Sequence, residues 1–342
     1  MGILDWFKNR PAQFDPDGVS EEMIRSATEK AITLTNPRLK VLPSCYLHLA
    51  PAVKISIEFL RTLIQALPAA RPVSPASWAA DPAWRAFFGA PGDITVALGR
   101  SDNLRTLFAK APELDEACLV LGMAFSEQHV FGLALQGDMV HRDVVQTSVS
   151  FSDHRAHICS RDESRLRRIA GVQAFEYLLA RALVEIGGDR VERQELEGKR
   201  ALLRARLRLL QQHGPGLGSM FGSPPAGRGE QAGLEAELVA NERQLEAIGD
   251  SQSALAMELE ALREVLAKPE QYLHVGQRQL RLNTMNVVLD GKSTEAAAEV
   301  AFSVAELTGP PPVQRAFVLA RVTRAELPAT QGINFADAAR YL

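Results

Sequence analysis

Residues 234–266 read LEAELVANERQLEAIGDSQSALAMELEALREVL, and this stretch decides how the chain is organised. Its apolar residues follow alternating three- and four-residue steps: Leu234, Leu238, Leu245, Ile248, Leu255, Leu259, Leu262 and Leu266. That spacing is the heptad of a coiled coil. Asn241 and Gln252 occupy the two seam positions left over. Because a polar residue at a seam fixes register at a cost in stability, we predict that role for both.

A helix of this length needs a partner, and the preceding residues supply one. Residues 166–210 carry Leu and Ile on the same steps, interrupted at Gly187-Gly188. Asp189 and Glu192 resemble a capping box there, which predicts that the first helix stops and restarts. Residues 213–229 contain nine Gly or Pro residues, too many for a helix to continue. The chain is therefore expected to turn back and form an antiparallel helical hairpin, with a second helix from Glu230 to Ala267.

The charges of the two arms favour the same pairing. Residues 161–212 hold 12 Lys or Arg against 8 Asp or Glu, whereas residues 229–268 hold 3 against 9. Opposite signs spread over two helices select partner and orientation, although single exposed pairs contribute little. The basic stripe of Arg200, Arg204 and Arg208 is accordingly interpreted as facing the acidic helix and not a nucleic acid.

Strand patterns flank the hairpin on both sides. Residues rich in Val, Phe, Leu and Thr predict strands at 117–126, 129–136 and 139–151 before it, and at 281–289, 299–307 and 314–323 after it. Gly137-Asp138 marks a turn, and a β-meander is the simplest arrangement. A closed hairpin brings its ends, Arg161 and Lys268, together, so both strand groups should join one sheet.

The first part of the chain is mostly helical, with helices expected at 20–34, 51–67, 77–88 and 101–110 and N-caps at Ser20 and Ser101. Residues 1–8 form a short amphipathic segment with Trp6 and Phe7. We favour its packing on its own domain, and contact with a membrane surface is the alternative.

The predicted fold class is thus α+β, with a helical N-terminal region, an antiparallel β-sheet base of about six strands and an inserted antiparallel coiled-coil helical hairpin. The expected bounds are 1–112 for the helical region, 113–160 and 269–342 for the two halves of the β domain, and 161–268 for the hairpin, whose tip is 213–229.

Composition excludes several classes of protein. A net charge of −3 provides no global positive field for nucleic acid or anionic lipid. The three cysteines, Cys45, Cys118 and Cys159, are odd in number and widely spaced, which predicts reduced thiols. The chain has no long apolar run and no secretory signal pattern, so the expected location is the cytoplasm. Thirty Arg against eight Lys is typical of a GC-rich bacterial genome.

Several fragments imitate catalytic motifs, and each lacks a required part. Gly291-Lys292-Ser293 has no opening glycine of a phosphate loop, and His141-Arg142-Asp143 has no Asn at the kinase metal position. Ser101-Asp102-Asn103 matches one triplet of the penicillin-recognising enzymes, without their nucleophile motif.

Two groups of residues could carry chemistry. The stretch Ser152–Cys159 holds Asp153, His154, His157 and Cys159, which are zinc ligands or a nucleophile with its base in other proteins. In an extended strand, at most three of these face one side, so we interpret the stretch as a strand-to-helix junction capping a helix near Asp162. Cys45 and His48 form a second thiol–imidazole pair without a third orienting group. The sequence therefore assigns no catalytic, cofactor or metal residue, and no cofactor is expected.

The resulting functional prediction is a non-catalytic interaction or scaffold protein that presents the coiled-coil arm to a protein partner. Two alternatives stay open. One is an enzyme of unfamiliar class using the N-terminal helical region or the His154–Cys159 segment. The other is a peripheral membrane protein using residues 1–8.

Overall fold

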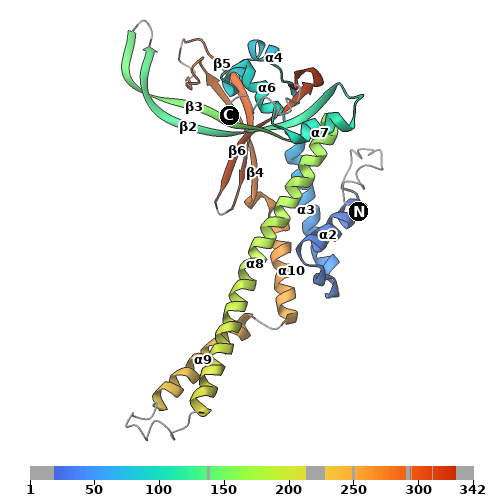
Figure 1. Cartoon of the computed structure of the whole chain (residues 1–342), viewed down its shortest axis with the longest axis vertical. Helices are drawn as coiled ribbons and strands as arrows, with labels where there is room; N and C mark the ends of the chain where they lie inside the picture. The colour runs from blue at the N-terminus through green and yellow to red at the C-terminus, as the bar shows by residue number, and fades with distance from the viewer. Residues whose placement is uncertain are drawn as a thin grey trace, which may run out of the picture. The chain divides into compact units, whose positions relative to one another are not determined.

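The computed structural model (Figure 1) describes residues 19–136, 139–212, 228–248, 251–289, 293, 295–309 and 311–328. The chain forms two compact units, each built from two stretches. The helical unit comprises residues Met1–Glu58 and Tyr177–Pro269, and the sheet unit comprises Phe59–Glu176 and Glu270–Leu342. The amphipathic segment at residues 1–8 lies outside the described residues. No helix in the described ranges is both long and apolar enough to cross a bilayer.

The helical unit combines N-terminal helices with the helices of the predicted hairpin. Its described elements are α2 (Glu21–Thr35), η1 (Pro37–Val41), the first part of α3 (Cys45–Gln65), most of α8 (Glu163–Gln212), α9 (Arg228–Ile248) and α10 (Ser251–Ala267). Ser20 caps α2, because its hydroxyl accepts a hydrogen bond from the Met23 N–H at 3.2 Å. The prediction that the next helix starts at Pro51 is wrong: α3 begins at Cys45 and carries Pro51 inside it.

Two hydrogen bonds, one part-buried and one buried, tie the N-terminal segment to α10. The Asn36 amide donates to the Glu258 carboxylate at 2.6 Å, and the Ser56 hydroxyl donates to the Leu266 carbonyl at 2.5 Å. Apolar side chains of α2, α3, α8 and α10 are buried in this unit; they include Ile32, Leu49, Val53, Leu178, Leu179, Ala182, Ile186, Leu259, Leu262 and Leu266. The part of the helical unit where α2, α3, α8 and α10 pack together, here called the base of the helical unit, therefore has a hydrophobic core of its own.

α8 is one continuous helix of 50 residues, so the predicted interruption at Gly187-Gly188 is wrong. A Cβ at either glycine would meet no atom within 4 Å, and helix geometry is retained there without any packing constraint. The returning helix is described as α9 and α10, on either side of residues 249–250, which lie outside the described residues. The predicted tip also lies outside them, apart from Arg228 and Gly229, which already belong to α9.

The sheet unit contains the predicted six-stranded sheet. Its strands are β1 (Arg71–Pro72), β2 (Glu116–Gln136), β3 (Met139–Ser160), β4 (Leu273–Leu282), β5 (Ala298–Leu307) and β6 (Val313–Thr323). The order is β3-β2-β6-β5-β4, with β1 beside β6. Its neighbours pair antiparallel, apart from the short parallel pair of β1 and β6. The strand groups before and after the arm thus join through β2 and β6, as expected.

Three strand predictions are corrected. Residues 117–126 and 129–136 are one strand, β2, because the polar residues between them continue the ladder with β3. β3 runs on to Ser160, past the expected end at 151. The strand expected at 281–289 instead spans Leu273–Leu282 and ends in a turn where Asn286 has φ 56°. The predicted turn at Gly137-Asp138 lies outside the described residues.

After that turn the chain bridges back to the opposite edge of the sheet. Val287 pairs with Ser148 of β3 and Val288 pairs with Leu282 of β4. The Val149 N–H donates to the Asn286 carbonyl and the Val288 N–H donates to the Thr147 carbonyl, both at 2.8 Å. The outer edge of β3 is therefore covered along this part of its length.

Four of the described α-helices lie wholly within the sheet unit: α4 (Pro75–Ala80), α5 (Pro82–Phe87), α6 (Pro91–Gly99) and α7 (Asp102–Lys110). The helix expected at 77–88 is divided at Asp81, whose carboxylate accepts from the Ala83 N–H at 2.9 Å and caps α5. α6 was not expected, whereas α7 and its Ser101 cap agree with the prediction. Side chains of α5–α7 share one buried cluster with β2, β5 and β6, which includes Trp84, Phe87, Leu98, Leu121 and Phe302. A second cluster on the other face of the sheet contains Leu67, Cys118, Leu166 and Leu319.

Candidate functional site

The His154–Cys159 segment lies in β3, and two bulges break its alternation. The ladder with β2 shifts register between Gly122 and Ala124 and again between Val120 and Leu121. Asp153 has φ 48°, in the left-handed region that side chains other than Asn, Asp or Gly rarely adopt. As a result the residues that an ideal strand would place on one face are separated: Asp153 and His157 are exposed, and Cys159 packs against the main core cluster.

Asp153 and His154 each have a local structural contact. Asp153 forms ion pairs with Arg155 at 2.7 Å and Arg315 at 2.9 Å. The His154 ring stacks on Phe88 with centroids 4.2 Å apart, and burial lowers its pKa. Burial raises the pKa of the Cys159 thiol to about 11, so it is protonated near neutral pH and a poor nucleophile.

The pair Cys45 and His48 is also separated. Cys45 is buried in the first turn of α3 and burial raises the pKa of its thiol, whereas His48 is exposed. Within the described residues, no three His, Cys, Asp or Glu side chains come together as a metal site would require. The cap on the helix after β3 comes from Asp162, whose carboxylate accepts from the Arg165 N–H at 2.7 Å.

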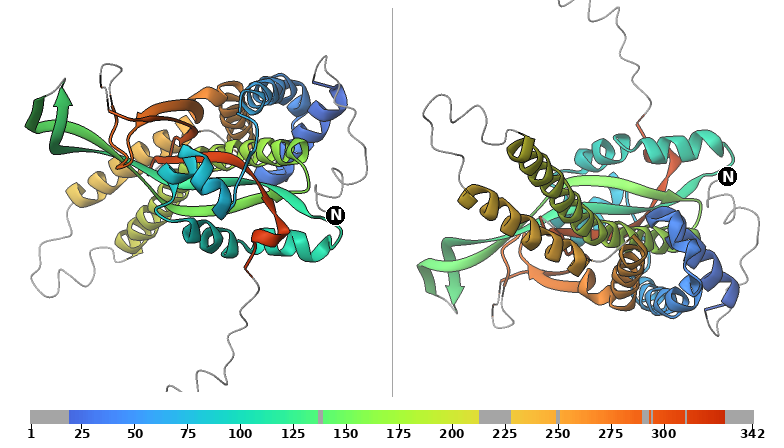
Figure 2. Two further views of the ribbon diagram at one scale, coloured as in Figure 1. Left: turned by 90° about the horizontal axis from the view of Figure 1, so that it is seen from above. Right: turned by 90° about the horizontal axis from the view of Figure 1, so that it is seen from below.

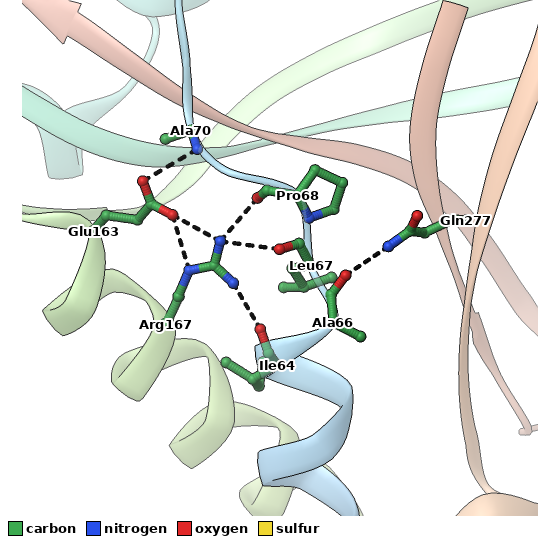
Figure 3. Close-up of polar contacts among 8 residues, drawn as sticks. All are labelled: Ile64, Ala66, Leu67, Pro68, Ala70, Glu163, Arg167 and Gln277. Atoms are coloured by element: carbon green, nitrogen blue, oxygen red, sulfur yellow. Dashed lines mark hydrogen bonds and ion pairs between the residues drawn. The ribbon is translucent and has the colours of Figure 1, made fainter. Parts of the chain in front are cut away.

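A polar cluster in the sheet unit centres on Arg167 of α8 (Figure 3). Its guanidinium donates to the carbonyls of Ile64, Leu67 and Pro68 at 2.7, 3.0 and 2.9 Å. Ile64 lies in the last turn of α3, and Leu67 and Pro68 follow the end of that helix at Gln65. The carboxylate of Glu163 accepts from the same guanidinium at 2.7 Å.

The surroundings of this cluster are also bonded. Glu163 accepts from the Ala70 N–H at 3.1 Å, and the Gln277 amide of β4 donates to the Ala66 carbonyl at 2.5 Å. Burial alone would raise the pKa of Glu163, but the hydrogen bonds from Arg167 and Ala70 lower it overall. The guanidinium fastens the end of α3 and the residues after it to α8, which makes the cluster a helix cap and not a ligand site.

A cavity beside this cap is too small for a substrate. It is lined by residues of the α3–β1 connection and of β5 and β6, among them Leu67, Pro68, Phe302 and Phe317. Its volume is about 10 Å³, room for about one water molecule. Pockets that bind small molecules measure several hundred Å³, so this cavity offers no active site.

The helices of the arm carry the other group of residues with an unusual environment. Leu203 and Leu207 of α8 form a buried cluster with Leu234 of α9, and Leu238 packs against it. Beside them the Arg204 guanidinium lies 2.7 Å from the Glu242 carboxylate, with both side chains partly exposed. The basic side chain at 204 therefore faces an acidic residue of the same chain.

Asn241 is the most unusual residue of the arm. It is only 2% exposed, and neither its amide nitrogen nor its amide oxygen has a hydrogen-bond partner. Leaving a buried amide unpaired costs roughly 1–3 kcal/mol. The side chain of Gln252, its counterpart in the sequence pattern, lies outside the described side chains.

The outer surface of the arm carries apolar side chains that the heptad did not identify. Leu202 is 70% exposed, and Val184 and Val239 are about half exposed. The sequence doublet Leu202-Leu203 could have indicated such an exposed side chain, since two adjacent helical residues cannot both face one seam.

No protein-family model matches this chain, and neither curated proteins nor solved structures show a significant match to it.

Proposed function

We propose that this chain is a non-catalytic interaction or scaffold protein, in which residues 161–268 form an antiparallel coiled-coil hairpin that presents its outer surface to a protein partner. The leucine cluster between α8 and α9 and the ion pair of Arg204 with Glu242 support the pairing of the two helices. Pairing Leu203 with Leu238 would place Asn241 opposite Arg200, a polar layer within an apolar seam.

The observation that carries the function is the exposed Leu202. A helix that pairs only with the returning helix of its own chain needs apolar residues at the seam, and an apolar residue exposed outside the seam adds nothing to that pairing. The part of α8 within the helical unit, Tyr177–Gln212, is about 54 Å long, at roughly 1.5 Å per residue. Such length adds little to a core and much to reach, which fits presentation of a binding surface.

The enzyme alternatives receive less support from the geometry. The residues of the His154–Cys159 segment and the pair Cys45 and His48 do not converge, and their thiols are buried with raised pKa values. The membrane alternative rests on residues 1–8, which lie outside the described residues.

Affinity capture of the tagged chain from its own cells, followed by mass spectrometry, tests the proposal. The comparison is a variant in which residues 194–247 are replaced by a short Gly-Ser loop. This deletion retains all of α10 and its hydrogen bonds to Asn36 and Ser56, so the base of the helical unit is kept. A partner lost with the deletion supports the proposal, whereas an unchanged partner list contradicts it.

A further inference from the structure

Among the residues that the structure describes, β2 has a long edge without a partner strand. It pairs with β6 only from Glu116 to Met123, while its ladder with β3 continues to Gln136. In Figures 1 and 2 the β2–β3 ribbon runs on past the ends of the other strands of the sheet unit. A two-stranded ribbon without further packing is only marginally stable in water, so such an extension is costly unless another chain covers it.

The free edge also carries exposed side chains. Ser126–Phe131 are six consecutive exposed residues. Phe131 is 77% exposed and lies directly opposite Val145 of β3, which is 60% exposed. The outer edge of β3 differs in part, because the chain around Asn286 bonds it at residues 147–149. In the described part of the chain, β2 has no second partner strand beyond Met123.

This edge lacks the usual protection against pairing. Natural sheets block free edges with Lys, Pro or inward-pointing charges. From Ala124 to Gly132 the strand contains no Lys, Arg or Pro, and Glu127 is its one acidic residue. The side chains on one face, at positions 124, 126, 128, 130 and 132, are all uncharged. A strand of this kind is a template for another strand.

We propose that the β2 edge between Ala124 and Gly132 pairs antiparallel with the same edge of a second copy of this chain. A two-fold axis at Gln128 puts Glu127 of each copy opposite His129 of the other, and Phe131 opposite Phe125. If the axis passed residue 127, the Glu127 carboxylates of the two copies would lie opposite each other. If it passed residue 129, Phe131 of one copy would lie opposite Glu127 of the other. The axis at Gln128 is the register that pairs the Glu127 carboxylate with the His129 imidazole and one phenylalanine ring with another.

The present contacts of these side chains are compatible with that pairing. Glu127 lies 3.0 Å from Arg278 of β4, and both side chains are partly exposed. The Thr147 hydroxyl lies 3.3 Å from the His129 ring nitrogen Nδ1, which leaves Nε2 to meet a carboxylate across the axis. On the other face, the hydroxyls of Ser126 and Ser150 bond to one another at 2.7 Å.

Sedimentation velocity on the full chain tests the pairing, from about 1 to about 100 µM, a range that detects micromolar association. We expect a concentration-dependent dimer. His129→Glu, which places like charges opposite each other twice in the dimer, should weaken dimerisation about tenfold, and His129→Lys should strengthen it. His129 is exposed, so neither variant disturbs the fold of one chain.

A cysteine at the axis gives a second readout. Under mild oxidation Gln128→Cys should form a disulfide-linked dimer, because residue 128 meets its own copy. Ser126→Cys should not, because its neighbour across the axis is Val130. A chain that stays monomeric at the highest concentration, or a Ser126→Cys variant that crosslinks as well as Gln128→Cys, would overturn the proposal.

Discussion

Replacing Arg167 with methionine should destabilise the sheet unit strongly, because one guanidinium holds the end of α3. The variant removes hydrogen bonds to three backbone carbonyls and the ion pair with Glu163. The Arg167 side chain is 20% exposed, so water can replace only part of what is lost.

The size of the effect follows from these contacts. A hydrogen bond from a charged donor contributes roughly 1.5–3 kcal/mol when buried, and less where the acceptor can be rehydrated. Taking about 1 kcal/mol for each carbonyl gives a loss of about 3 kcal/mol in the free energy of unfolding. Arg167→Lys should recover little of it, since a single ammonium cannot reach all three carbonyls.

Urea unfolding followed by tryptophan fluorescence measures this loss. Trp78 and Trp84 both belong to the sheet unit and donate to the carbonyls of Phe88 and Pro72, and a Trp6→Phe background removes the remaining tryptophan. Arg321→Met is the matched control, because its contact with Glu116 at 3.8 Å is exposed and should contribute less than about 0.5 kcal/mol. If the Arg167 and control variants unfold at the same urea concentration, the helix-cap account is wrong.

Three further outcomes are expected. Cysteines in place of Leu207 and Leu234 should crosslink within one chain, and crosslinks found only between chains would show that the helices pair intermolecularly. Changing Asn241 and Gln252 to Leu should raise the thermal midpoint and permit slipped or larger assemblies in light scattering; an unchanged midpoint in a single monomeric species would refute the register role. Burial lowers the folded-state pKa of His154 from its ordinary 6.5, so the free energy of unfolding should fall as pH decreases through that value, and a His154→Gln variant with the same pH dependence would contradict this.

Long-range features with a strong period were predictable from the sequence. The heptad identified the leucines of α8 and α9 that are buried together, and the alternation in residues 299–307 and 314–323 located β5 and β6 closely. The joining of both strand groups in one sheet followed from the expected proximity of residues 161 and 268. In each case many residues report the same feature, so single exceptions do not change the result.

Features fixed by tertiary packing were not predictable. Gly187-Gly188 favours a helix end locally, yet α8 passes through it, because propensity is weaker than the context of a long helix. The bulge at Asp153 depends on the ladder with β2 and leaves no local signal, so the faces of His157 and Cys159 could not be assigned. In the sequence, Arg167 is one of many charged residues of the predicted hairpin, and its role could not be predicted. Only the fold brings its side chain to the end of α3.

A photo-crosslinking amino acid at Leu202 tests the central claim, that the outer surface of the arm binds a protein partner. The position is 70% exposed, and the same amino acid at Val313, which is 43% exposed in the sheet unit, is the control. After irradiation of living cells, we predict a discrete heteromeric adduct from position 202 and none from position 313. An adduct from position 313, with none from position 202 and none from Val184 or Val239, the other exposed apolar positions of the arm, would contradict the account.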